Sequence, residues 1–171
     1  QFSFSGEVKK LNGTSFPLSG VNKTFYWQED NNSHSHIDKL HLYTDMWGSA
    51  SRGADGYVGT PVEVLLEDNK VVGIKTDGAY QTAVPAGMQI LHGDGKAAAF
   101  LKTLKIGDEL DVSYSMSPNM DWQMVIGGHA LLVNNAQVVP YTKDLSALGG
   151  VRARTAAGIS ADGQKVYIVS A

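Results

Sequence analysis

The densest group of potential metal ligands lies between residues 33 and 41 of the 171-residue chain. His34, His36 and Asp38 are two residues apart, and in an extended strand such residues project from the same face. Two imidazoles and a carboxylate can hold zinc or iron(II). Because no distant motif supplies a further ligand, an exposed polar loop that leads into a strand explains the cluster more simply.

Two other segments carry groups that could contact a substrate. Gly127 and Gly128 allow close approach of the backbone, and His129 follows them. Arg154 precedes a run of small residues that begins at Thr155, and its planar guanidinium can bind phosphate or carboxylate. Taken alone, these patterns are more typical of a tight strand turn and a surface arginine.

Other familiar catalytic patterns are missing. The segment 93–96 reads Gly-Asp-Gly-Lys, which lacks the glycine spacing and the Ser or Thr of a P-loop, so a capped turn into a helix explains it. There is no Gly-x-Ser-x-Gly elbow for Ser-His-Asp hydrolysis. Four glutamates that could serve as acids or bases are interpreted as residues of the solvent face: Glu7, Glu29, Glu63 and Glu109.

The composition narrows the class of protein. Hydrophobic residues make up 43% of the chain and charged residues 18%, which predicts a packed globular fold. The net charge of -3 argues against nucleic acid as a partner, and no apolar run is long enough to insert into a membrane. With no cysteine, disulfides and thiolate chemistry are excluded. Together with the abundant Gly and Ser, this composition fits an exported bacterial protein.

Short alternating runs predict the elements that must position these groups. Residues 62–66 and 71–74 read as a hairpin with a four-residue loop, and residues 110–116 read as a strand with one wet face. Apolar residues recur at spacings of three and four from about 95 to 104, which predicts one helix that Asp94 could cap. The expected fold class is therefore α+β, predominantly β, with a mixed or antiparallel sheet and one clear helix near residues 95–104.

The end of the chain predicts another hairpin. Residues 155–160 and 165–170 flank Asp162-Gly163, a pair that suits a tight turn. The last run, residues 166–169, is apolar at every position and reads as a central strand buried on both faces. Such a strand needs neighbours, so a further polypeptide piece or segment is expected beside it.

Taken in order, several segments resemble the bacterial phosphodiester glycosidase family, relatives of the enzyme that removes N-acetylglucosamine from a phosphodiester to uncover mannose 6-phosphate. The most specific stretch is Arg154 to Gly163, which reads RTAAGISADG. Further segments that resemble sequence motifs of the family are GVN at 20–22, LHLYT at 40–44, VPAG at 84–87, IGD at 106–108 and IGGHALLV at 126–133. The resemblance implies one segment, 1–171, of such a domain that is incomplete at both ends, with an Asn-Gly-Asp-Phe-Phe-like stretch upstream and an Asp-Gly-Gly-Gly-Ser-like loop downstream.

The resemblance implies hydrolysis of a sugar-1-phosphate diester in cell-envelope or exopolysaccharide glycans, by a secreted or envelope protein. This chain would supply scaffold and substrate contacts and would be inactive alone. Arg154 would grip the phosphate with support from Thr155, while Gly127, Gly128 and His129 would line the substrate. No catalytic residue is assigned. No cofactor is evident, and whether a divalent cation assists stays open.

Two alternatives remain at this stage. A noncatalytic carbohydrate-binding β-module would use loop aromatics to stack on sugar rings, with Trp27, Tyr43, Trp47 and Tyr57 as the candidates. A metal-binding protein would use the histidine cluster around His34 and His36.

Overall fold

The computed structural model describes residues 3–23, 27–28, 33–52, 59–118, 132–140 and 155–170. The chain folds into two compact units, Gln1–Met120 and Asp121–Ala171. That the whole chain is one incomplete domain stays a prediction.

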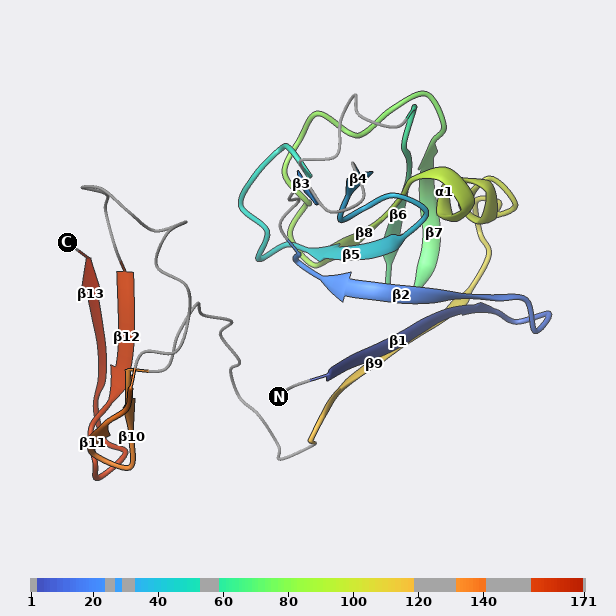
Figure 1. The fold of residues 1–171 in the computed structure, drawn as a ribbon. Helices are drawn as coiled ribbons and strands as arrows, with labels where there is room; N and C mark the ends of the chain where they lie inside the picture. Colours follow the sequence, from blue (N-terminus) through green and yellow to red (C-terminus); the bar gives the residue numbers. More distant parts are fainter. Residues whose placement is uncertain are drawn as a thin grey trace. The chain divides into compact units, whose positions relative to one another are not determined.

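The described part of the first unit is built on a seven-stranded sheet in the order β7-β6-β8-β5-β2-β1-β9 (Figure 1). All neighbouring strands are antiparallel except β2 and β5, which are parallel. The strands are β1 (Ser3–Lys10), β2 (Ser15–Val21), β5 (Leu40–Thr44), β6 (Val62–Glu67), β7 (Lys70–Lys75), β8 (Met88–Gly93) and β9 (Leu110–Ser117). Two short strands, β3 (Trp27–Gln28) and β4 (Ser33–His34), pair separately. The mixed sheet confirms the predicted fold class.

Helix α1 (Gly95–Leu101) packs on one face of this sheet. Alternation in β5, β6 and β8 places their apolar residues against it, and the core contains Leu40, Leu42, Val62, Val64, Leu66, Leu91, Ala97, Ala98, Phe100 and Leu101. Gly93 permits the close approach, because a Cβ there would lie 2.9 Å from the carbonyl carbon of Ala97. The sheet and the helix therefore enclose one continuous apolar core.

The helix boundaries differ slightly from the sequence prediction. Asp94 caps the N-terminus as expected, with its side chain accepting a 2.8 Å hydrogen bond from the Gly95 amide. The helix ends three residues before Leu104, because the amides of Thr103 and Leu104 bond three residues back, to Phe100 and Leu101, in tighter turns. Leu104 nevertheless stays in the core.

The β6–β7 hairpin is confirmed, but its loop has two residues rather than four. Asp68 and Asn69 both take positive φ, 48° and 62°, as a type I′ turn requires. Glu67 and Lys70 consequently pair as the last residues of the two strands. The strand predicted at residues 110–116 is β9, and it too is confirmed.

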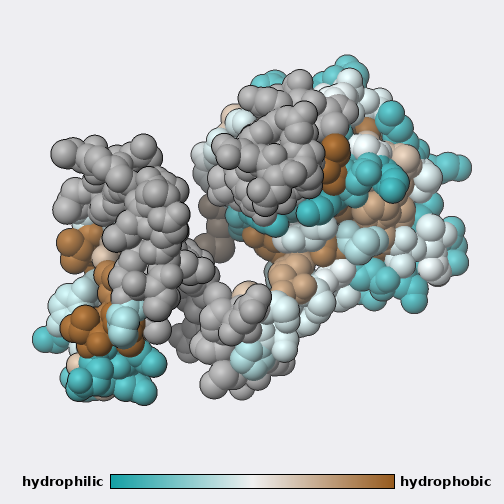
Figure 2. Space-filling view, in the orientation of Figure 1, coloured by the Kyte–Doolittle hydropathy of each residue, from teal (hydrophilic) through white to brown (hydrophobic). Residues whose placement is uncertain are grey.

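In the second unit, β12 (Thr155–Ile159) and β13 (Val166–Ser170) form the predicted antiparallel hairpin. A smaller hairpin joins β10 (Val133–Asn134) to β11 (Gln137–Val138). For residues 166–169 the sequence predicts a strand that needs neighbours on both faces, and the described residues do not supply them. Within the described residues β13 pairs with β12 only, and these four side chains are 53–73% exposed. Figure 2 accordingly shows hydrophobic atoms at the surface of the hairpins.

Within the described ranges, no helix is both long enough and apolar enough to cross a membrane.

Candidate functional site

Of the five residues predicted to contact substrate, the structure describes one. Thr155 begins β12, lies opposite Ser170 in the strand pair, and is exposed. Gly127, Gly128, His129 and Arg154 lie outside the described residues. The grouping of these five residues around a substrate therefore stays a prediction.

The described residues instead hold a buried polar cluster on the sheet face opposite α1. His41 of β5 pairs directly with His92 of β8, and His92 pairs directly with Glu63 of β6. Directly paired residues share a face, so the three polar side chains form a row across three strands. All three are fully buried. We call this face of β5, β6 and β8 the polar face.

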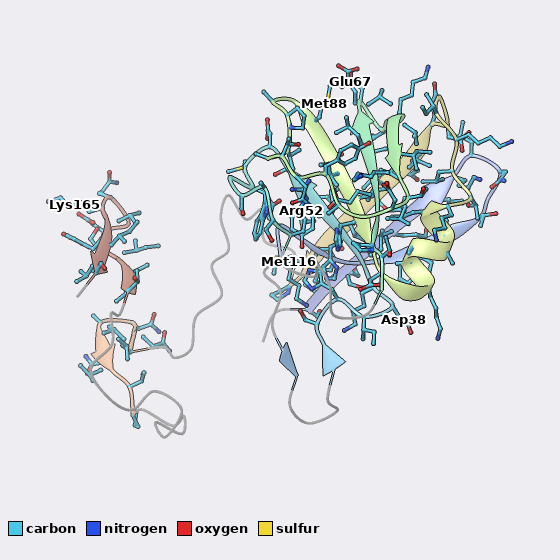
Figure 3. All side chains as sticks on the ribbon, turned by 90° about the horizontal axis from the view of Figure 1, so that it is seen from above. Asp38, Arg52, Glu67, Met88, Met116 and Lys165 are labelled. Carbon is cyan, nitrogen blue, oxygen red and sulfur yellow. The ribbon has the colours of Figure 1, made fainter. Side chains whose placement is uncertain are left out.

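Glu63 is the centre of a compensated charge cluster. Arg52, which Figure 3 labels, reaches it from the segment after β5. Its Nη2 donates to Oε2 at 3.2 Å, and its Nε lies 3.0 Å from Oε1. The Nε contact is an ion pair without hydrogen-bond alignment, because that N–H is not directed at an acceptor. The Tyr80 amide donates to Oε2 at 2.6 Å, and His92 Nδ1 donates to Oε1 at 2.8 Å. Each carboxylate oxygen thus has two partners.

Arg52 also holds two loops together beside the cluster. Its Nη1 donates to the carbonyls of Ala50 at 2.7 Å and Thr82 at 2.8 Å. The side chain has no solvent exposure. A buried guanidinium is tolerated only when paired and hydrogen-bonded, and these contacts meet that condition. Burial, and next the charge of Glu63, raise the pKa of the neighbouring Tyr80 phenol.

His36 lies above the row in a turn rather than in a strand. Its Nδ1 is 2.9 Å from Ser35 Oγ, and its Nε2 is 2.8 Å from Tyr43 Oη. Tyr43 donates its single proton to the Lys23 carbonyl at 2.9 Å, since a carbonyl oxygen can only accept. Nε2 of His36 must therefore donate to Tyr43, which fixes the proton on that nitrogen.

His41 has the opposite character. Its ring stacks on His36 with centroids 3.8 Å apart, yet neither ring nitrogen of His41 has a hydrogen-bond partner. Desolvation first, and then the charges of His36, Lys23, His92 and Lys39, lower the pKa of His41 from 6.5 to about 2. His41 is consequently neutral in the folded protein.

The end of β2 closes this side of the cluster. A register shift between Leu18 and Gly20 turns Gly20 toward His41, and a Cβ at Gly20 would lie 3.4 Å from the imidazole. Asn22, at φ 47°, then clasps the end of β5: its Nδ2 donates to Thr44 Oγ1 at 2.8 Å and its Oδ1 accepts from the Thr44 amide at 2.9 Å. The bulge in β2 and the two hydrogen bonds between Asn22 and Thr44 therefore set the space around the His41 imidazole.

For the histidine–aspartate segment the sequence favours an exposed polar loop over a common strand face, and the structure has a turn there in which His36 is buried rather than exposed. Residues 35–38 form a turn, and Asp38 takes φ 56°, so alternation does not continue from His34 through Asp38. The Asp38 carboxylate accepts a hydrogen bond from the Lys96 amide at 2.8 Å, whereas His36 is buried on the polar face. The side chain of His34 lies outside what is described. Among the described residues, no group of three or more His, Cys, Asp or Glu has the geometry to hold a metal ion.

The aromatic residues proposed to stack on sugars divide between interior and surface. Tyr43 is fully buried, so it is not available to a glycan. Trp47 is half-buried, packs at 61° against Tyr43 and donates from Nε1 to the Ser51 carbonyl at 3.1 Å. The side chain of Trp27 and the whole of Tyr57 lie outside the described part of the chain.

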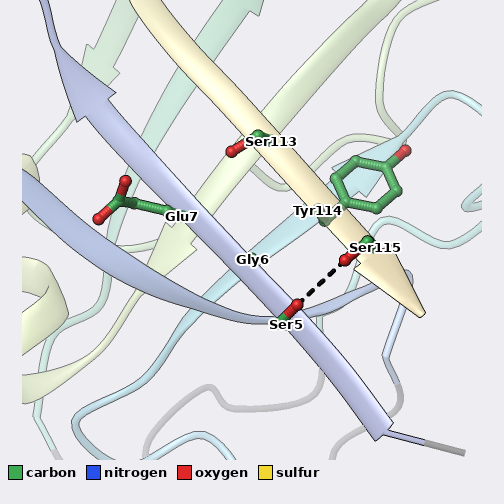
Figure 4. A pocket seen from close by; sticks show the side chains of 6 residues that line it. All are labelled: Ser5, Gly6, Glu7, Ser113, Tyr114 and Ser115. Atoms are coloured by element: carbon green, nitrogen blue, oxygen red, sulfur yellow. Dashed lines mark hydrogen bonds between the residues drawn. The ribbon is translucent and has the colours of Figure 1, made fainter. Parts of the chain in front are cut away.

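An open hollow of about 350 Å³ lies on β1 and β9 (Figure 4). Its hydroxyls belong to exposed serines and to the exposed Tyr114, and Ser5 and Ser115 bond to each other at 3.1 Å. Glu7, also exposed, accepts from Ser15 at 2.7 Å. Because its polar groups are exposed and Ser5, Ser115 and Glu7 already have hydrogen-bond partners, the geometry of the hollow does not indicate catalysis.

Sequence reasoning missed Arg52 and His92, and it placed Glu63 on a solvent face. Glu63 alternates with Val62 and Val64, which correctly predicts that it points away from the helix. That the second face is also covered follows only from the segments around residues 35–36, 50–52 and 79–84. Glu7 and Glu109 are exposed as expected, and Glu29 lies outside the described residues.

Comparison with known families matches residues 53–171 to the phosphodiester glycosidase family. This match covers more than half of the chain, and the chain belongs to that family. Among curated proteins nothing matches.

Two solved structures are similar in fold. A hypothetical protein from Synechocystis matches 99% of this chain with a TM-score of 0.58 and 17% identity. A protein from Burkholderia pseudomallei K96243, described as exported, matches 68% of this chain with a TM-score of 0.56 and 17% identity. The chain spans 31% and 26% of those two proteins, respectively.

Proposed function

We propose that this chain is part of an exported glycosidase that hydrolyses a sugar-1-phosphate diester in cell-envelope or exopolysaccharide glycans. The family membership of residues 53–171 carries the proposal. Hydrolysis of such a diester requires a site that binds a phosphate anion and positions a sugar beside it. The chain would contribute scaffold and substrate contacts to that site.

Arg154 is the residue proposed to bind the phosphate. A guanidinium makes two parallel hydrogen bonds to phosphate oxygens, a geometry that lysine cannot reproduce. Thr155 would support it from the exposed start of β12. Gly127 and Gly128 would let the backbone approach the substrate, and His129 would stand at its edge.

The test is Arg154→Ala in a longer protein that contains this chain, assayed with a chromogenic sugar phosphodiester. Loss of a charged hydrogen-bonding partner is worth about 1.5–3 kcal/mol, so kcat/KM should fall roughly 10- to 100-fold. Arg152→Ala is the matched control, two residues away, and should change kcat/KM little. Equal losses in both variants, or none in Arg154→Ala, would show that the arginine assignment is wrong.

We expect the 171 residues alone to be inactive. The similar solved structures are about three to four times longer than their matching parts, and β13 exposes apolar side chains on its hairpin. A second polypeptide piece or a further segment of the same protein would cover them and complete the site. Turnover of the diester by the 171-residue chain by itself would contradict this expectation.

Export is the remaining part of the proposal, supported by the similar protein that is described as exported. Fractionation of the source cells, followed by immunoblotting for this chain, tests it. Recovery in the medium or envelope fraction is expected, and recovery only with cytoplasmic markers would contradict it.

A further inference from the structure

The polar face contains two kinds of buried group that differ in their hydrogen-bond partners. Glu63 is neutralised by Arg52 and has a partner for each oxygen. His41 is equally buried but has no hydrogen-bond partner at either nitrogen, and its ring is stacked on a second imidazole at 3.8 Å. A proton added to His41 would therefore create a buried charge that no acceptor stabilises.

We propose that the His36–His41 stack is an acid-sensitive latch: while His41 is neutral it holds the turn at residues 35–38 against the polar face, and proton uptake by His41 releases that turn. The proposal does not depend on the proposed enzymatic function.

The groups that face His41 all act in the same direction. His36 belongs to the turn, His92 to β8, Lys23 follows β2, and Lys39 precedes β5; each disfavours the imidazolium, and burial of the ring disfavours it most. The carboxylate of Glu63 lies in the same row, but Arg52, His92 and the Tyr80 amide already occupy it. Proton uptake by His41 thus adds a positive charge at a place where the neighbouring groups disfavour one.

The lowered pKa of His41 sets the direction of the pH effect. The folded-state pKa of His41 is about 2, below the ordinary value of 6.5, so a state in which the ring meets water binds the proton more readily. The latch is therefore fully closed above about pH 6.5, and acidification below that value favours opening. For one proton, the equilibrium constant for opening rises about tenfold per pH unit.

The turn is the element that opening would release. It is tied to the sheet through His36, which stacks on His41 and donates to Tyr43, and it closes on itself through the Lys39 amide, which donates to the His36 carbonyl at 3.1 Å. Opening exposes the Lys39 amide to exchange with solvent. Its protection factor, the exchange rate relative to that of the unfolded chain at the same pH, therefore reports on the latch.

The experiment is amide hydrogen exchange of the 171-residue chain, followed by NMR at pH 7.5, 6.5, 5.5 and 4.5. The protection factor of Lys39 should fall roughly 100-fold between pH 7.5 and 4.5. The Gly13 amide, which closes the β1–β2 turn through a 2.9 Å bond to the Lys10 carbonyl, is the internal control and should not show this fall. Equal falls at Lys39 and Gly13 would indicate global unfolding and overturn the proposal.

His41→Gln tests the source of the effect, since its flat amide can stack on His36 but does not titrate. In this variant the protection of Lys39 should change less than about threefold over the same range, because the coupled proton is lost. A wild-type pH dependence that survives in His41→Gln would overturn the assignment to His41.

A third measurement needs no variant and covers the case in which His41→Gln fails to fold. The ring signals of His41 in the folded wild-type chain are followed from pH 7.5 downward. The folded-state signals should keep the chemical shifts of a neutral imidazole while the open population grows. A normal titration of the folded state with a midpoint near pH 6.5 would contradict the latch.

Discussion

The two faces of the same three strands are buried in opposite ways. On one face, β5, β6 and β8 present aliphatic side chains to α1, and the layer is held by contact area. On the other face, the same strands present His41, Glu63 and His92 beside a smaller apolar cluster that includes Tyr43 and Ile90, and burial of the polar row depends on charge pairing and hydrogen bonds. An apolar contact can be weakened by degrees, whereas a buried charge that loses its partner carries the full cost of desolvation.

The largest loss is expected from Glu63→Ala. It leaves the Arg52 guanidinium buried without its counter-ion and should lower the free energy of unfolding by about 3–5 kcal/mol, measured by urea denaturation. Glu67→Ala, at the exposed end of the same strand, is the control and should change stability little.

The double variant Arg52→Met with Glu63→Leu distinguishes charge pairing from packing. Because both charges are removed together, it should be markedly more stable than Glu63→Ala. If the double variant is as unstable as the single one, the polar face is stabilised by packing of these side chains rather than by pairing of their charges.

On the apolar face, Leu101→Ala should lower the free energy of unfolding by about 2–4 kcal/mol through lost burial and a residual cavity. Leu101 is 0% exposed at the end of α1. The control is Leu11→Ala, whose side chain is 76% exposed and should contribute little. Similar losses in both variants would mean that α1 does not cover this face in solution.

Gly93→Ala tests the spacing between helix and sheet. The added Cβ would lie 2.9 Å from backbone of Ala97 and 2.9 Å from Leu101 Cδ1, so the helix must shift. We expect a loss of about 1–3 kcal/mol in urea denaturation. Gly48→Ala, where a Cβ would meet nothing within 4 Å, is the control. Unchanged stability of Gly93→Ala would show that the helix can move outward freely.

The smallest effect concerns the cap of the helix. Asp94→Ala removes the acceptor of the Gly95 amide and should cost about 1 kcal/mol of unfolding free energy. Asp94→Asn keeps a capping oxygen and should recover most of this loss. A thermal-denaturation comparison of the two variants measures the difference, and equal loss in both would assign the effect to the charge of Asp94 instead of the cap.

Local sequence pattern was sufficient to predict those elements in which the hydrophobic periodicity and the flanking turn or capping residues agree. The alternation at residues 62–66 and 71–74 predicted the β6–β7 hairpin, but the pattern did not show that Asp68 and Asn69 would both adopt positive φ and shorten the loop. The helix was predicted with its cap, although its last turn tightens where Thr103 and Leu104 bond three residues back. Turn geometry depends on the strands and layers that flank it, which a local window does not contain.

The candidate site was less predictable from sequence. The spacing of His34, His36 and Asp38 favoured a common face only if the segment was extended, and the turn at 35–38 removes that premise. Arg52, Glu63 and His92 are separated by 11 and 29 residues along the chain, and no motif links them. Their association comes from antiparallel pairing of β6 with β8 and from a loop that folds back over the sheet.

By itself the sequence determined the β-rich class, the helix with its Asp94 cap, the two hairpins and the resemblance that the family match confirms. Local periodicity, turn residues and short motifs are sufficient to predict these features. Only the tertiary structure decided that the second face of β5, β6 and β8 is covered, that Arg52 neutralises Glu63 and that His41 is buried without a partner. The physical reason is that alternation fixes the face on which a side chain lies, whereas what covers that face is fixed by distant segments.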